Sequence, residues 1–352
     1  MLVLDNLIFR WQTGGGISSV WYELSKRIIE QCHDYMFYEY SNSNKNHLRK
    51  KLSIPSSHIK TLSDSFFFLK KYLPVSCHID DTFIFHSSYY RTCSDKKAIN
   101  VITLHDFTYE YFRFGLTKFI HCKTKYKALR NADYIVCISN NTKTDLAKFV
   151  PDINLDKVSI IYNGVSEEYF PLDVKKQNLL LFVGARDEYK NFDLAVISAS
   201  KANMPLFICG KKLTKEEKEL LDKFLPSKYR FLGFISNEEL NTYYNKAYAL
   251  LYPSSYEGFG IPVIEAQKAG CPVIAMNSSS IPEIIGNDEL LINDATPDAI
   301  IEKINILKDS EEREKIVKLG IENAKNYSWN KTFQNYQKLY QYIIKENFGK
   351  FQ

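Results

Sequence analysis

The chain has 352 residues, enough for about two domains that each bury a core of their own. Hydrophobic residues make up 45% and charged residues 25%, as in ordinary soluble globular proteins, and the net charge of +5 is too small to indicate nucleic-acid binding by itself. The seven cysteines are scattered and form no Cys-x-x-Cys pair. They therefore predict neither a zinc site nor a disulfide framework, and reduced thiols in a cytoplasm are the simplest interpretation.

The N-terminal apolar stretch is interrupted by Asp5 and Arg10, which excludes an ordinary signal peptide. No uncharged apolar run approaches the ~20 residues that span a bilayer. Short apolar runs then alternate with amphipathic stretches, which is typical of parallel sheets covered by helices. In the first half we predict strands at residues 101–104, 134–138 and 158–162. We predict helices at 17–29 and 140–149, the second capped by Ser139.

The second half continues the same alternation. We predict strands at residues 179–183, 206–209, 248–252, 272–275 and 290–292. One intervening helix opens with a capping box of Ser236 and Glu239. A polar, lysine-rich stretch at 173–178 predicts a boundary, giving domains 1–174 and 175–352. The last helix, 329–347, has an aromatic face, and we expect it to cross back to the first domain.

The strongest chemical signal is the segment Ser-Tyr-Glu-Gly-Phe-Gly-Ile-Pro-Val-Ile-Glu at 255–265. It follows a predicted strand and runs into a helix. Gly258 and Gly260 allow a ligand to approach the backbone, and the unpaired N–H groups of a helix start suit a phosphate. Glu257 lies on the loop and Glu265 about two turns into the helix. One carboxylate can therefore reach a sugar ring while the other reaches a ribose diol.

Two glutamates separated by seven residues, with Gly-Phe-Gly-Ile-Pro between them, resemble the signature of retaining glycosyltransferases of family four. The resemblance covers nearly the whole chain. It implies an α/β protein with two Rossmann-like domains facing a central cleft, the GT-B architecture. It also implies a catalytic role for Glu257. The donor-binding residues that it implies in this segment are Gly258, Phe259, Gly260, Ile261 and Glu265.

The segment from Val183 to Asn191 is similar to the family's Gly-x-Arg…Lys-Asn segment. The resemblance implies that Gly184 lines the donor site and that Arg186 and Lys190 bind the donor diphosphate. Fixed cations there stabilise the charge that develops on the leaving phosphate. A surface ion pair of Arg186 with a neighbouring acidic residue is the structural alternative.

Other matches to the family are weaker. Gly15 and Gly16 precede an amphipathic helix, as in the family's glycine-rich loop, although a flexible turn explains them equally well. His105 resembles the histidine that approaches the donor sugar, where a buried structural histidine is the alternative. Phe234 and Ile235 lie in a segment that resembles the loop facing the base.

The sequence contains no Asp-x-Asp, the pair with which many other glycosyltransferases hold a divalent ion. We therefore expect no metal and no cofactor, with the diphosphate charge neutralised by Arg186, Lys190 and helix N-termini. The expected partners are a nucleotide-sugar donor and a saccharide or lipid-linked saccharide acceptor, and no nucleic acid.

A basic stretch free of acidic residues runs from Tyr111 to Ala132. It suits an anionic acceptor or peripheral contact with an anionic membrane, and a solvated helix face is the alternative. Its cations are Arg113, Lys118, Lys123, Lys125, Lys127 and Arg130. The Phe66-Phe67-Phe68 run followed by Lys70 and Lys71 can add to this surface or form a core helix.

These observations predict a cytoplasmic enzyme, peripheral to the membrane at most, that transfers a hexosyl unit with retention from GDP-mannose or a UDP-hexose. A weak similarity to bacterial mannosyltransferases favours GDP-mannose, and O-antigen or other polysaccharide synthesis is the expected setting. An inactive nucleotide-sugar-binding scaffold is one alternative. A dinucleotide-dependent oxidoreductase is another, with Asp34 as its ribose-binding acid. Base, sugar, acceptor, linkage and oligomeric state leave no trace in the sequence.

Overall fold

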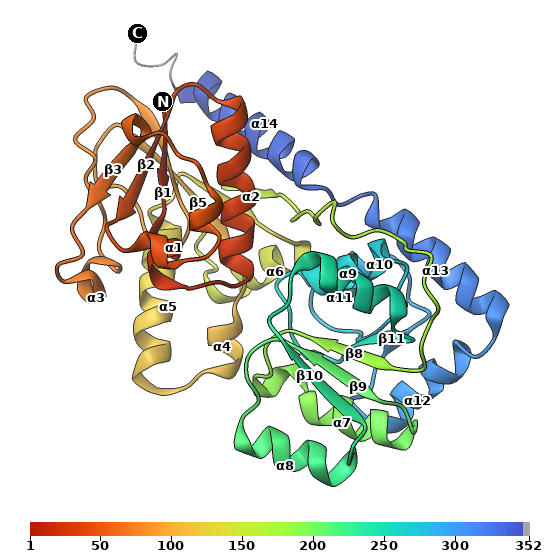
Figure 1. Cartoon of the computed structure of the whole chain (residues 1–352). Helices are drawn as coiled ribbons and strands as arrows, with labels where there is room; N and C mark the ends of the chain where they lie inside the picture. Colours follow the sequence, from red (N-terminus) through yellow and green to blue (C-terminus); the bar gives the residue numbers. More distant parts are fainter. Residues whose placement is uncertain (348–352) are drawn as a thin grey trace. The chain divides into compact units, whose positions relative to one another are not determined.

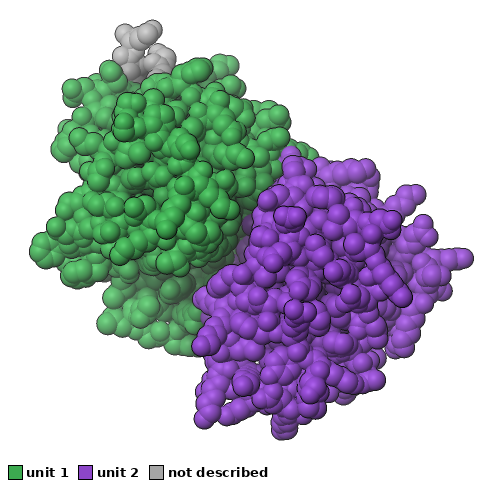
Figure 2. Space-filling view, in the orientation of Figure 1, with its two compact units in different colours: residues 1–163, 329–352 green, residues 164–328 purple. Residues whose placement is uncertain are grey.

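The computed structural model describes residues 1–347, which form two compact units (Figure 1, Figure 2). Unit 1 contains residues 1–163 and the C-terminal segment from Trp329, and unit 2 contains residues 164–328. The division falls before the 174/175 boundary expected from the lysine-rich stretch. The reason is that the intervening residues bind unit 2: the Phe170 and Leu172 amides donate to the Asn241 and Asn245 side chains, at 3.1 and 2.6 Å.

Unit 1 is built on a parallel seven-stranded sheet with the order β3-β2-β1-β4-β5-β6-β7. Its strands are β1 (Leu2–Asp5), β2 (Tyr35–Tyr40), β3 (Ile59–Leu62), β4 (Phe83–Ser87), β5 (Ala98–Leu104), β6 (Tyr134–Cys137) and β7 (Val158–Ile160). Its α-helices are α1 (Leu7–Trp11), α2 (Gly16–Gln31), α3 (Phe67–Lys70), α4 (Thr108–Phe112), α5 (Gly115–Arg130), α6 (Asn140–Phe149) and α14 (Trp329–Asn347).

The C-terminal helix α14 belongs to the core of unit 1. Phe333, Tyr336 and Ile343 are buried in the same cluster as Leu4 and Trp21. The aromatic face at helical spacing therefore packs against residues more than 300 positions away in the sequence, which explains why unit 1 contains both ends of the described chain.

Unit 2 is built on a parallel six-stranded sheet with the order β10-β9-β8-β11-β12-β13. Its strands are β8 (Leu180–Val183), β9 (Leu206–Cys209), β10 (Tyr229–Gly233), β11 (Ala249–Tyr252), β12 (Val273–Met276) and β13 (Leu291–Ile292). Its α-helices are α7 (Phe192–Lys201), α8 (Lys215–Phe224), α9 (Asn237–Lys246), α10 (Ile261–Lys268), α11 (Ile281–Ile285), α12 (Pro297–Ile306) and α13 (Ser310–Ala324).

Both sheets have the doubly wound order of a Rossmann fold, in which the strand order reverses beside the first strand. Every strand predicted from the sequence is present within a few residues of its expected bounds, and α6 begins at the expected Ser139 cap. The four strands before residue 90 had no prediction. They include β2, where tyrosines, a methionine and a glutamate hide the apolar pattern, and the exposed edge strand β3.

A buried ion pair joins the first strand of unit 1 to the loop after β4. The Arg91 guanidinium donates to the Asp5 carboxylate, with Nε 2.8 Å from Oδ2, and both side chains are almost completely buried. Ser87 and Tyr40 hydrogen-bond Asp5 and Arg91, respectively, at 2.9 and 2.7 Å. The strand order reverses here, so the pair ties together the two strand ends of the switch point.

We expect Arg91→Met to lower the free energy of unfolding by about 3–5 kcal/mol, because it leaves the Asp5 carboxylate buried without a counter-ion. Arg130→Met is the matched control, since Arg130 pairs with Asp152 on the surface and its loss is worth about 1 kcal/mol or less. Thermal unfolding of the two variants checks this. Equal, small losses in both would contradict a structural role for the buried pair.

Candidate functional site

The candidate site of unit 2 lies where the carboxyl ends of β8 and β11 meet. These strands are neighbours on either side of the order reversal, the position at which doubly wound sheets bind ligands. The loops after them are joined directly. The Ser255 amide donates to the Tyr189 carbonyl at 2.8 Å, and Asn191 Nδ2 donates to the Pro253 carbonyl at 2.8 Å. The Arg186–Lys190 segment and the Glu257 motif therefore form one site.

Lys190 and Glu257 make the central contact of this site. Lys190 Nζ lies 2.5 Å from Glu257 Oε1, and both side chains are largely buried. The Tyr252 hydroxyl also hydrogen-bonds the Glu257 carboxylate, and burial next to this charge raises the pKa of Tyr252 well above its usual range. An ammonium group has three donors, so Lys190 can hold Glu257 and still offer protons to a ligand anion.

Two serines that the sequence analysis did not select hold the Glu257 loop in place. The Glu257 amide donates to Ser279 Oγ at 2.8 Å. Ser280 Oγ donates to the carbonyls of Glu257 and Phe259 at 2.9 and 3.0 Å. The triple-serine run at 278–280 was the available signal, but only the packing of the loop after β12 on this motif gives it a role.

The start of α10 follows this loop with its amide end uncapped. Gly260 occupies the N-cap position with φ of 101°, and no side chain of the described residues caps the helix. This left-handed φ favours glycine, and a Cβ there would also lie 2.7 Å from Ile281 Cδ1, which would have to shift. An uncapped helix start beside a cation is suited to an anion.

The side chain of Phe259 lies in the interior of unit 2. Its ring is buried and packs edge-on against Tyr327, with ring centroids 5.8 Å apart. Any donor contact from this residue must therefore come from its main chain. The donor-binding roles of Gly258 and Ile261 stay predictions.

Glu265 lies among tyrosine hydroxyls on α10. The Tyr244 hydroxyl donates to Glu265 Oε2 at 3.1 Å, and Tyr169 also hydrogen-bonds the carboxylate. Burial raises the pKa of Glu265 to about 7, although the two tyrosine hydrogen bonds act in the opposite direction. A carboxylate of this kind accepts hydrogen bonds from a diol when it is ionised.

Arg186 extends toward α8. Its Nη2 donates to the carbonyls of Lys211 and Lys212 at 2.6 and 3.0 Å, and its Nε lies 2.9 Å from Glu217 Oε1. Nη1 is buried and has no hydrogen-bond partner. We expected the alternative ion pair of Arg186 to involve an acidic residue next to it in the sequence. Its partner Glu217 lies 31 positions away, so the sequence did not indicate this pair. A role of Arg186 in binding the donor diphosphate stays a prediction.

Three further residues that are predicted to bind the nucleotide-sugar donor lie at the carboxyl ends of β8 and β10. Gly184 packs against Gly210. A Cβ added to Gly210 would overlap the carbonyl oxygen of Gly184. Phe234 follows β10 and is 81% exposed, and Ile235 beside it is partly buried. An exposed aromatic ring at a strand end is available to stack on a ligand ring.

The glycine loop of unit 1 lies at the start of α2. Gly15 is the N-cap residue and a Cβ on Gly16 would meet open space. Two side chains from the segment after β2 stabilise this loop. Asn46 Nδ2 donates to the Gln12 carbonyl at 2.7 Å, and His47 contacts the Thr13 carbonyl. The predicted nucleotide-facing role of this loop stays a prediction.

His105 follows β5 and is almost completely buried. Burial lowers its pKa to about 4, against the opposing charge of Asp106. Its imidazole is therefore neutral near pH 7 and able to hydrogen-bond without carrying charge. Contact with a donor sugar stays a prediction.

Asp34 does not fit the dinucleotide alternative. It precedes β2 and pairs with the N-terminal ammonium group at 2.9 Å, so it lies at the amino end of the sheet. A ribose-binding acid must lie at the carboxyl end of the strands.

The prediction that Lys125 belongs to the basic surface is wrong. It is completely buried, with Nζ 2.7 Å from the Glu110 carboxylate and 3.1 Å from the Asp106 carbonyl. It therefore cannot reach a membrane or an acceptor. The buried Glu110, which precedes the acid-free stretch by one residue, supplies its counter-charge.

The other cations of this stretch remain at or near the surface. Lys118 donates to the Glu110 carbonyl at 2.8 Å and Arg130 pairs with Asp152 at 2.7 Å. Arg113, Lys123 and Lys127 are exposed. A search of residues 1–347 identifies no helix that combines the length and the apolar character of a membrane span.

Cys77, Cys93 and Asp95 are close enough together to hold a metal ion, with the two Sγ atoms 3.8 Å apart. They lie in unit 1, and Asp95 already accepts the amides of Cys77 and His78 at 2.9 and 2.8 Å. We therefore interpret the cluster as a structural turn. Metal independence of the donor site stays a prediction.

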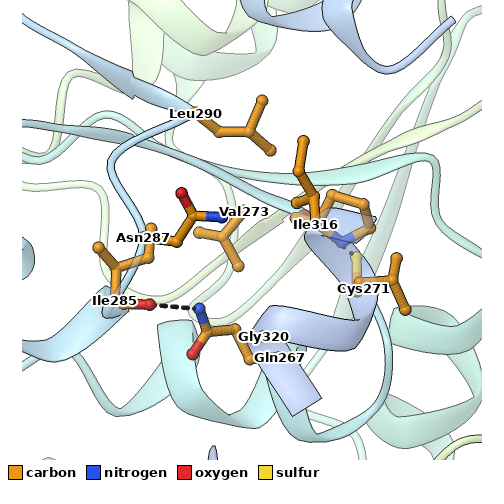
Figure 3. A pocket seen from close by; sticks show the side chains of 10 residues that line it. Gln267, Cys271, Val273, Ile285, Asn287, Leu290, Ile316 and Gly320 are labelled. Carbon is orange, nitrogen blue, oxygen red and sulfur yellow. Dashed lines mark hydrogen bonds between the residues drawn. The ribbon is translucent and has the colours of Figure 1, made fainter. Parts of the chain in front are cut away.

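A small cavity lies on the other side of α10 (Figure 3). Gln267 lines it and donates to the Ile285 carbonyl at 2.7 Å. Its volume is ≈ 20 Å³, room for about one water molecule. Residues two apart on a helix point in nearly opposite directions, so this cavity and Glu265 do not share a face.

We expect the free energy of unfolding of the ligand-free protein to fall as the pH rises from about 4.5 to about 7, by on the order of 3 kcal/mol at most from Glu265 alone. Folding raises the pKa of Glu265. The stability that this carboxyl contributes is therefore complete below its unfolded-state pKa and is lost as the pH rises through about 7. Glu265→Gln should remove this part of the pH dependence in thermal unfolding. Glu302→Gln, an exposed change on α12, is the control, and identical pH profiles in all three proteins would contradict the prediction.

Two family models match adjoining parts of the chain. The model described as Glycosyltransferase Family 4 matches residues 14–169, and the model described as Glycosyl transferases group 1 matches residues 167–324.

Among curated relatives, the O-antigen chain mannosyltransferase RfbU of Salmonella typhimurium is 31% identical over 199 residues, 54% of this chain and 56% of that protein. O-antigen chain mannosyltransferase B of Escherichia coli is 25% identical over 256 residues, 65% of this chain and 66% of that protein. The chain thus matches less than two thirds of the length of either relative.

Solved structures share the fold over almost the whole chain. Sucrose-phosphate synthase from Thermosynechococcus elongatus is similar with a TM-score of 0.77 and 17% identity, covering 98% of this chain and 99% of that one. Anabaena HepE in complex with UDP and glucose has a TM-score of 0.74 and 14% identity, covering 97% and 99%. The two Rossmann-like units, the matched family models and these neighbours together show that the chain belongs to glycosyltransferase family 4 and has the GT-B fold.

Proposed function

We propose that the protein transfers a hexosyl unit from a nucleoside diphosphate sugar to an acceptor hydroxyl, with retention at the anomeric carbon. The observation that carries this proposal is the Lys190–Glu257 contact beside the uncapped start of α10. It combines a cation and helix amides for a diphosphate with a carboxylate for sugar hydroxyls, in a chain of this family.

In the proposed reaction, the bond between the anomeric carbon and the β-phosphate oxygen breaks. A bond from the same face to the acceptor oxygen forms, and the acceptor proton passes to the departing phosphate. Lys190, Arg186 and the Ile261 amide at the start of α10 stabilise the charge on the leaving group. Glu257 binds sugar hydroxyls, and Glu265 accepts hydrogen bonds from the ribose. These charges make a divalent metal unnecessary, and no other cofactor is needed.

For the donor we favour GDP-mannose over a UDP-hexose. Two curated relatives are named mannosyltransferases, whereas the structural neighbour bound to UDP shares 14% identity. The names of the same relatives refer to the O-antigen chain, so we propose a lipid-linked oligosaccharide as acceptor. The reaction then takes place in the cytoplasm at the inner face of the cell membrane.

We expect GDP to raise the thermal unfolding midpoint more than UDP, ADP, TDP or NAD, each tested with EDTA present. A ligand at 100 times its dissociation constant stabilises the folded state by about 2.7 kcal/mol. A shift with UDP alone would replace GDP-mannose by a UDP-hexose. A shift that requires a divalent ion would overturn metal independence, and binding without turnover would favour an inactive scaffold.

We expect Lys190→Met and Glu257→Gln to lower kcat by roughly 10²–10³ while the fold persists, because each removes a group that acts on the reacting sugar diphosphate. Lys201→Met is the matched control, since Lys201 forms an exposed ion pair with Asp298 in the same unit. Transfer rates with radiolabelled donor measure the effect. Wild-type rates in both site variants would show that the site has been misplaced.

A further inference from the structure

Helix α5 of unit 1 presents large apolar side chains to solvent. Phe114, just before its first turn, is 82% exposed, and Leu116 and Phe119 are 71% and 61% exposed. The opposite side packs on unit 1, where Cys122, Ala128 and Leu129 are buried together with His121 and the Lys125–Glu110 pair. A surface helix normally presents polar side chains to solvent. The exposed apolar side therefore has no role in the packing of unit 1.

The segment from Phe66 to Leu73, which includes α3, repeats this feature. Phe66 and Phe68 are 68% and 64% exposed. Between them, Phe67 turns inward, where it packs edge-on against Tyr40 at 4.8 Å and below the Arg10 guanidinium. Phe66 has a left-handed φ of 58°, which is unfavourable for an aromatic residue.

The two segments meet at a cavity of ≈ 160 Å³ that is lined by Leu73 on one side and by Lys123 and Lys127 on the other. Both lysines are exposed. They lie one turn apart on α5, and Lys123 Nζ lies 5.7 Å from the Phe119 ring centroid, so the cationic and apolar groups share one side of the helix. Figure 1 shows α3 and α5 within unit 1. The exposed side chains of these two segments form what we call the interfacial face: Phe66, Phe68, Leu73, Phe114, Leu116, Phe119, Lys123 and Lys127.

We propose that the interfacial face binds the surface of an anionic phospholipid bilayer. Its aromatic side chains enter the boundary between headgroups and acyl chains, and Lys123 and Lys127 lie at the lipid phosphates. Protruding rings exposed by more than 60% suit a bilayer, which adapts to their shape, whereas a protein partner needs matching pockets. The positive charge of the two lysines favours a bilayer that contains anionic lipids.

This binding is independent of the transfer reaction proposed above. It needs no nucleotide, and its residues lie in unit 1, whereas Lys190 and Glu257 lie in unit 2. Loss of nucleotide binding and loss of bilayer binding can therefore be observed separately.

The test is sedimentation of the full chain with vesicles of phosphatidylcholine alone or mixed with phosphatidylglycerol. We expect binding to the mixed vesicles that weakens as salt is added. Phe114→Ser combined with Phe119→Ser should lower the bound-to-free ratio by about tenfold or more. Lys123→Glu combined with Lys127→Glu should do the same on mixed vesicles.

Lys318→Glu combined with Leu319→Ser, an exposed pair on α13 of unit 2, is the matched control and should bind as the wild type does. Circular dichroism and the nucleotide-induced melting shift verify folding. If the Phe114 and Phe119 variant misfolds, Phe66→Ser combined with Phe68→Ser replaces it. Wild-type protein that stays in the supernatant, or phenylalanine variants that bind as the wild type does, would overturn the proposal. So would a self-associated wild type whose phenylalanine variants are monomeric, since a second copy would then cover this face.

Discussion

The contact between Lys190 and Glu257 is the interaction around which the candidate site is organised. The two residues are 67 positions apart, and they meet because the parallel sheet of unit 2 places β8 beside β11. Backbone and side-chain hydrogen bonds fix the loops that carry them, including those of Ser279 and Ser280. The chemistry of the site thus depends on strand order, because a different neighbour for β8 would separate the cation from the carboxylate.

The ligand-free site already balances its charges internally. Glu257 compensates Lys190, Glu217 compensates Arg186, and Glu265 is held among tyrosines with a pKa raised to about 7. This arrangement lets the cations remain in a partly buried place without an anion present. The Lys190 ammonium keeps donors beyond its contact with Glu257, as the proposed binding of a diphosphate requires.

Unit 1 uses buried charge in a different way. The pairs Asp5–Arg91 and Lys125–Glu110 lie inside it, where each holds the end of a strand or a helix to its neighbours. Lys125 lies on the buried side of α5, whereas Phe119 on the same helix and Phe114 just before it are exposed. The expected basic surface therefore contains one cation fewer and includes exposed aromatic rings, the groups that we propose contact lipid.

The sequence by itself determined the glutamate motif, the parallel α/β class, most strands after residue 100 and the Ser139 and Ser236 caps, because these depend on short-range periodicity and local hydrogen bonding. Only the tertiary structure decided that Lys125 is buried, that Arg186 meets Glu217 and that two serines hold the Glu257 loop. Each of these rests on contacts between residues far apart in the chain. Such contacts follow from strand order and helix packing, which leave no fixed spacing in a single sequence.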